Sequence, residues 1–144
     1  MKRLLARTLT CAAFATLGCS DTPTSPSTTT TTAAVVEPTI IEDFGGTIGL
    51  GTSSFYSFTI VQAGTVQVTF SSVGGSNVPA TVWMGLGIGQ PSGEDCVTTN
   101  AINTQAGTSP QLTGTYASGV YCVKITDIGN LVAPARFAIS IGHP

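Results

Sequence analysis

Apolar and polar residues alternate with a period of two through most of the chain after residue 39. Tyr56, Phe58 and Ile60 share one side of such a segment, and serine and threonine occupy the other side. The same alternation recurs in residues 65–70, 81–89, 120–126 and 136–141, with a shorter stretch at 112–116. A period of two is typical of strands with one buried and one wet face. We therefore predict an all-β fold, an antiparallel, jelly-roll-like β-sandwich of seven to eight strands over residues 39–144.

The stretch 90–110 is polar and lacks this alternation, so we expect it to be a long loop. It contains Cys96, and Cys122 lies on the strand predicted at 120–126. An even pair of cysteines outside the cytoplasm usually forms a disulfide. Cys122 alternates with the apolar residues that face the core. The predicted Cys96–Cys122 bridge should therefore hold the loop on the outer face of that strand.

The N-terminal residues have the features of an export sequence. Three basic residues lie within the first seven positions, and the uncharged stretch 8–17 follows them. That length suits a signal peptide and is too short to span a bilayer. Leu17-Gly18-Cys19 resembles a bacterial lipobox, which implies cleavage after residue 18 and lipidation of Cys19. The alternative is ordinary secretion after Ala13-Phe14-Ala15, which leaves Cys19 as an odd thiol.

We therefore divide the chain into a lipoprotein signal peptide (1–18), a disordered Ser/Thr/Pro-rich tether (19–38) and the sandwich (39–144). Removal of residues 1–18 leaves two basic residues against seven acidic ones, a net charge of about −5. Nucleic acid is not an expected partner of so acidic a protein. We expect the lipid on Cys19 to hold the protein at the membrane of the bacterial envelope. In lipoproteins of this kind, Ser20 implies the outer membrane.

Three segments carry a resemblance to a known family. They are Tyr56-Ser57-Phe58-Thr59-Ile60, Ala63-Gly64-Thr65-Val66-Gln67-Val68-Thr69-Phe70 and Ala117-Ser118-Gly119-Val120-Tyr121-Cys122-Val123. They resemble the bacterial pre-peptidase C-terminal domain over residues 40–142. That resemblance implies a jelly-roll-like sandwich that accompanies secreted hydrolases without catalysing a reaction.

The sequence offers little for catalysis or cofactor binding. No nucleophile motif of the form G-x-S-x-G is present, and His143 near the C-terminus is expected to be exposed and inert. The acidic pairs Glu42-Asp43 and Glu94-Asp95, and Asp127 with Asn130, are expected to serve turns and solubility; a weak calcium site is the alternative. We predict no catalytic residue, no metal site and no cofactor.

Trp83 is the only tryptophan, and it lies beside Gly85 and Gly87 on the polar side of its segment. An exposed indole beside small residues would form a shallow binding trough. The interpretation that we favour is the other one, in which Trp83 fills the space left by these small residues and the 90–110 segment covers it. We predict a non-catalytic, lipid-anchored module for surface binding or envelope structure, with a glycan or an envelope protein as its partner. The alternative function is an accessory module that recruits a secreted hydrolase.

Overall fold

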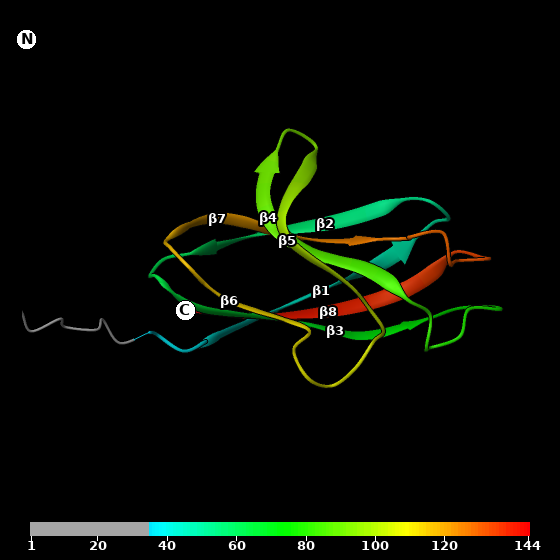
Figure 1. Cartoon of the computed structure of the whole chain (residues 1–144), viewed down its shortest axis with the longest axis horizontal. Coiled ribbons are helices and arrows are strands. Elements are labelled where there is room, and N and C mark those ends of the chain that lie inside the picture. The colour runs from blue at the N-terminus through cyan, green and yellow to red at the C-terminus, as the bar shows by residue number, and fades with distance from the viewer. Residues whose placement is uncertain (1–34) are drawn as a thin grey trace, which may run out of the picture. The chain divides into compact units, whose positions relative to one another are not determined.

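Eight strands form two antiparallel four-stranded sheets in the computed structural model, which describes residues 35–144 (Figure 1). The first sheet has the order β1-β8-β3-β6, and the second has the order β2-β7-β4-β5. The strands are β1 (Ile40–Ile48), β2 (Ser53–Ile60), β3 (Gly64–Gly74), β4 (Met84–Ser92), β5 (Asp95–Thr104), β6 (Leu112–Tyr116), β7 (Gly119–Thr126) and β8 (Ala135–His143). This order is that of a jelly roll, so the predicted fold class is confirmed.

The core lies between the sheets and consists of the residues that the alternation placed inward. Met84, Leu86 and Ile88 on β4 are fully buried, as are Phe58 and Ile60 on β2. Large apolar side chains from β3 and β8 complete this layer, among them Val66, Val68, Phe70, Ile139 and Ile141. The pattern of the sequence therefore predicted the inner faces of both sheets correctly.

The prediction of a loop over residues 90–110 was wrong, because residues 95–104 form β5. β5 is an edge strand, and nearly all of its side chains are exposed. Its pairing with β4 rests on backbone hydrogen bonds, which need no apolar side chains. An edge strand exposed on both faces therefore lacks the alternation by which β2, β4 and β7 of the same sheet were found.

The β4–β5 hairpin bends across the outer face of β7. The pairing register shifts between Ile88 and Gly89. A Cβ atom on Gly89 would lie 1.9 Å from the carbonyl oxygen of Val97, so only glycine permits this close approach of β5. The bend carries Cys96 over β7, where it forms a disulfide with Cys122.

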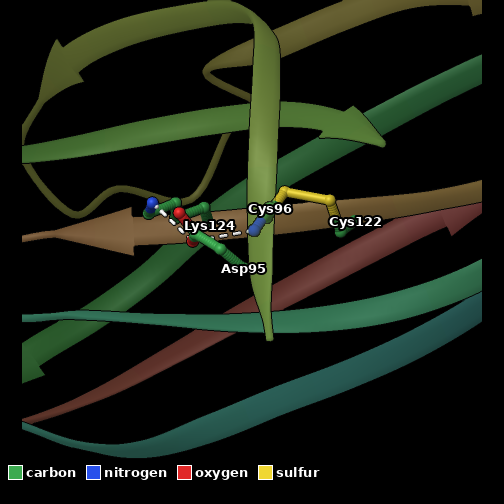
Figure 2. Close-up of polar contacts among 4 residues, drawn as sticks. All are labelled: Asp95, Cys96, Cys122 and Lys124. Atoms are coloured by element: carbon green, nitrogen blue, oxygen red, sulfur yellow. Dashed lines mark hydrogen bonds and ion pairs between the residues drawn. A yellow bond between two sulfur atoms is a disulfide. The ribbon is translucent and has the colours of Figure 1, made fainter. Parts of the chain in front are cut away.

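Figure 2 shows this crossing, with Asp95 beside Lys124 and Cys96 beside Cys122. The Cα atoms of the two cysteines are 5.9 Å apart. Next to them, Lys124 Nζ donates to Asp95 Oδ1 over 2.7 Å. The hydrogen bond between Asp95 and Lys124 holds the pKa of the Asp95 carboxyl below its usual value. The predicted disulfide is confirmed, and it joins two strands of one sheet rather than crossing the core.

The sandwich has two distinct ends. Ile40 at the start of β1 pairs with His143, whereas Ile48 at its end pairs with Ala135. The β1–β2, β3–β4 and β7–β8 connections therefore lie at one end, on the right in Figure 1, which we call the loop end. The chain enters β1 at the opposite end, where Val36 bridges to Gly64.

Candidate functional site

Trp83 lies at the loop end, directly before β4, and its residue surface is 51% exposed. Its neighbours Val82 and Met84 are buried, so the indole faces outward from the second sheet. The interpretation favoured from the sequence, in which the 90–110 segment covers Trp83, is therefore wrong. The single tryptophan contributes little to the core and is presented to solvent.

The two glycines predicted to lie beside Trp83 line a hollow that does not include the indole. A Cβ atom on Gly87 would lie 2.5 Å from Thr98 Cγ2, so β5 closes over this position. A hollow of about 170 Å³ remains between β4, β5 and β7. Its lining consists of Gly85, Leu86, Gly87, Thr98, Ala101, Ile102, Asn103, Lys124 and Thr126. Trp83 does not line it, so the structure does not join the indole and both glycines in one trough.

Asp127 ties together two connections of the loop end. Its Oδ2 accepts a hydrogen bond from the Gly51 N–H over 2.8 Å. Its Oδ1 accepts three more from the backbone N–H groups of Gly129, Asn130 and Leu131, at 2.9, 2.9 and 3.1 Å. Because Gly51 belongs to the β1–β2 connection and the other three to the β7–β8 connection, one carboxylate holds both in place.

The surroundings of Asp127 suit a carboxylate and do not suit a metal ligand. Burial raises the pKa of this carboxyl, but the four backbone N–H groups together lower it below its usual value. N–H donors occupy both carboxylate oxygens. Within residues 35–144, no three His, Cys, Asp or Glu side chains are grouped so that they could hold a metal ion. These contacts agree with the expectation that Asp127 stabilises a turn.

Two further side chains fix the β3–β4 connection, which carries Trp83. Asn130 Nδ2 donates to the carbonyl oxygen of Trp83 over 3.0 Å. Gln105 Nε2, from the β5–β6 connection, donates to the carbonyl oxygen of Thr81. The backbone around the indole is thus held from two sides, by connections that lie far from it in the sequence.

The β1–β2, β3–β4 and β7–β8 connections of the loop end carry four exposed apolar side chains. They are Leu50, Trp83, Ile128 and Val132, which we call the apolar rim. Residues 49–52, 75–83, 105–111 and 128–134 contain no charged residue and no histidine. The nearest charges along the chain are the buried Asp127 and the exposed Arg136. Arg136 lines a hollow of about 760 Å³ together with Gly75, Ser76 and Pro134, which belong to the same connections. The four residues of the apolar rim thus lie in segments that contain no charged residue, in a domain that is acidic as a whole.

Sequence reasoning found Trp83 but missed the other three members of the apolar rim. Leu50 and Ile128 each stand beside glycine, and Val132 lies two residues from Asn130 and from Pro134, in connections without alternation. A large apolar residue in such a turn predicts an exposed apolar side chain, because a turn has no strand face that could bury it.

The prediction that His143 is exposed was wrong, since only 1% of its surface is accessible. β8 continues through His143, which places the ring between the sheets at the end opposite the loop end. Its Nε2 lies 3.0 Å from Glu42 Oε1, and Tyr56 Oη donates to Glu42 Oε2 over 2.6 Å. This cluster joins β8 and β1 of the first sheet to β2 of the second.

The carboxyl of Glu42 is the centre of this cluster. The hydrogen bond from Tyr56 holds the pKa of Glu42 below its usual value, against the effect of burial and with a smaller contribution from His143. The same bond raises the pKa of Tyr56. Among residues 35–144, no serine, threonine or cysteine side chain forms a hydrogen bond with His143. The cluster closes the side of the sandwich between β1 and β2.

No model of a known protein family matches the chain, and no curated protein matches its sequence. The β-sandwich that the pre-peptidase resemblance implied is present. Across residues 35–144 the structure has no helix that could cross a membrane. Cys19, the predicted signal peptide and most of the predicted tether lie outside the described residues.

Proposed function

We propose that this protein is a non-catalytic, lipid-anchored module of the bacterial cell envelope that binds a partner through its loop end. One observation carries the proposal: the only tryptophan is exposed on a backbone that Asn130 holds in place. A folded protein gains little stability from an indole in that position, whereas aromatic side chains are frequent anchors of binding surfaces.

The disulfide suggests a location outside the cytoplasm, where cysteine pairs persist in oxidised form. Leu17-Gly18-Cys19 supports the finer proposal that a lipid on Cys19 anchors the mature chain, and Ser20 supports the outer membrane as its destination. Replacing Cys19 with serine should move the protein from the membrane fraction to the soluble fraction. Incorporation of labelled palmitate that persists in Cys19→Ser would contradict the anchor.

Two observations support a role in binding rather than catalysis. Glu42 and His143, which resemble parts of a catalytic set, instead join the two sheets, and the hydrogen bonds of Glu42 hold it in that place. The resemblance to the pre-peptidase C-terminal domain favours the same role, because that domain is a non-catalytic companion of secreted hydrolases.

The test compares the mature protein with Trp83→Ala and with Val61→Ala, an exposed apolar position at the opposite end of the sandwich. Binding to envelope fractions and to a glycan array is measured for all three. Trp83→Ala should lose binding, yet cost about 2 kcal/mol of stability or less, since the indole is only half buried. Val61→Ala should retain both. Undiminished binding by Trp83→Ala, at matched stability, would refute the proposed site.

A further inference from the structure

Arg136 and Lys124 are the two lysine or arginine residues in the described part of the chain, and their surroundings differ. Lys124 donates to Asp95 over 2.7 Å (Figure 2). Arg136 is exposed on β8 and forms no ion pair and no side-chain hydrogen bond within residues 35–144. In a domain where acidic residues outnumber basic ones, its guanidinium is therefore available to an anion from outside the chain.

Strand pairing sets Arg136 in a row of three residues on the outer face of the first sheet. Arg136 pairs with Thr47 of β1 on one side and with Gly74 of β3 on the other. Ile48 and Ala135, which precede or follow members of this row in the chain, are buried, so the row itself faces outward. A Cβ atom added to Gly74 would have nothing within 4 Å, so the surface beside Arg136 is open.

This row belongs to the hollow of about 760 Å³ described above, which we call the Arg136 hollow. Its lining also contains Ser72, Ser76 and Pro134. Thr47, Ser72 and Ser76 are exposed, and their hydroxyl groups form no hydrogen bond with any residue in 35–144. The volume lies within the range of about 300–1,000 Å³ that is typical of small-ligand sites. A cation and three hydroxyl groups without partners in this range thus line one hollow.

The acidic residues closest to this hollow along the strands and connections do not engage Arg136. Asp43 faces outward on β1 like Thr47, but lies four residues away, which is about 13 Å along the strand. Asp127 of the β7–β8 connection is buried and accepts four backbone N–H groups. The Arg136 hollow is therefore a positively charged place on a domain that is acidic as a whole.

From this chemistry we infer that the Arg136 hollow binds a saccharide that carries a carboxylate. A guanidinium matches a carboxylate through two parallel N–H···O bonds, and one arginine balances one negative charge. Serine and threonine hydroxyl groups both donate and accept hydrogen bonds, as sugar hydroxyl groups do. A phosphate diester only accepts, so it would leave the acceptor capacity of these hydroxyl groups unused. The exposed ring of Pro134 adds apolar surface for the carbon face of a sugar.

The place of the hollow in the sandwich also favours a saccharide over a lipid headgroup. The Arg136 hollow lies at the loop end, whereas the chain enters the sandwich at the opposite end, where Val36 bridges to Gly64. The nine residues of β1 separate these ends by about 30 Å. The inference goes beyond the proposed function, because Trp83 does not line this hollow.

The test titrates the full chain with oligomers of glucuronic, galacturonic and mannuronic acid. Each is compared with the same oligomer after its carboxyl groups have been reduced to alcohols. We expect an acidic oligomer to bind and its reduced form to bind at least tenfold more weakly. Arg136→Gln and Lys124→Gln form a matched pair, since each removes one positive charge. Arg136→Gln should weaken binding of the acidic oligomer by tenfold or more, whereas Lys124→Gln should leave it unchanged.

A second pair of variants tests the hollow without a change of charge. Gly74→Leu places a large side chain in the open space beside Arg136, and Gly74→Ala adds a single methyl group. Gly74→Leu should weaken binding by tenfold or more, with the circular dichroism spectrum of the natural chain, whereas Gly74→Ala should bind nearly as the natural chain does. Equal binding by both variants would overturn the assignment of the ligand to this hollow.

The remaining outcomes decide the class of ligand. Equal effects of the two glutamine substitutions, equal binding of acidic and reduced oligomers, or no binding of any oligomer would each overturn the inference. Binding to phosphatidylglycerol vesicles that Arg136→Gln abolishes and Lys124→Gln preserves, without binding of the oligomers, would assign the hollow to a phosphate headgroup instead. None of these failures decides the proposed function, which is tested through Trp83 and the envelope fractions.

Discussion

Asp127 provides a sharp test of how the loop end is held, because its two carboxylate oxygens have different tasks. Oδ1 accepts the three N–H groups within the β7–β8 connection, and Oδ2 alone reaches Gly51 in the β1–β2 connection. Asp127→Asn keeps an oxygen that accepts the first three bonds, but its amide nitrogen replaces the acceptor for Gly51. Asp127→Ala removes all four bonds.

The expected magnitudes follow from the number of bonds lost. A hydrogen bond to a charged group contributes about 1.5–3 kcal/mol, so Asp127→Asn should lower the free energy of unfolding by about that amount. Asp127→Ala should cost about 3–5 kcal/mol. The alanine cost stays below the sum of four bonds because Gly51, Gly129 and Asn130 are exposed and their N–H groups can turn to water, whereas Leu131 is buried.

Urea unfolding followed by circular dichroism measures these costs, with Asp43→Asn as the control. Asp43 is exposed and accepts no backbone hydrogen bond in the described part of the chain, so its substitution should change stability by less than about 0.5 kcal/mol. The emission of Trp83 reports on the loop end in the same samples. If Asp127→Asn costs as much as Asp127→Ala, the division of tasks between the two oxygens is refuted.

The pH dependence gives a second check of the same argument. The pKa of Asp127 is lowered from 3.8 in the folded protein, so the ionised carboxylate stabilises the fold above pH 3.8. This contribution is lost as the pH falls through the folded pKa. The stability difference between the natural chain and Asp127→Asn should therefore be constant near neutral pH and shrink below pH 3.8. A difference that grows in acid would contradict the sign of the shift.

Three further predictions concern other parts of the sandwich. Replacing both cysteines of the disulfide with alanine should lower the free energy of unfolding by about 2–4 kcal/mol and leave the β-sheet circular dichroism intact; loss of that spectrum would contradict this. Tyr56→Phe should raise the pKa of Glu42 toward its usual value, because the largest cause that lowers it is removed; a carboxyl titration followed by NMR measures this, and an unchanged pKa would refute it. Gly89→Ala should destabilise the hairpin by several kcal/mol, whereas Gly74→Ala, with nothing within 4 Å of the added methyl group, should be tolerated; equal unfolding midpoints in urea would refute the contrast.

The sequence by itself determined the inner faces of the sheets and the partners of the disulfide. Alternation works because successive side chains of a strand point to opposite faces, so Phe58, Ile60, Met84 and Leu86 were assigned to the core from local order alone. Cys96 and Cys122 could be paired because they are the only cysteines after residue 19. The assignment of core residues and the pairing of the cysteines can both be made without knowledge of which strands are neighbours.

Tertiary structure alone decided β5, the burial of His143 and the assembly of the apolar rim. β5 is defined by backbone pairing at a sheet edge, which leaves no period in its side chains. His143 meets Glu42 across 101 residues of sequence, and Asp127 meets Gly51 across 76. Contacts of this kind exist only once the order of strands brings distant connections to one end of the sandwich. That order depends on how two apolar faces close on each other, which the local pattern of any one strand does not contain.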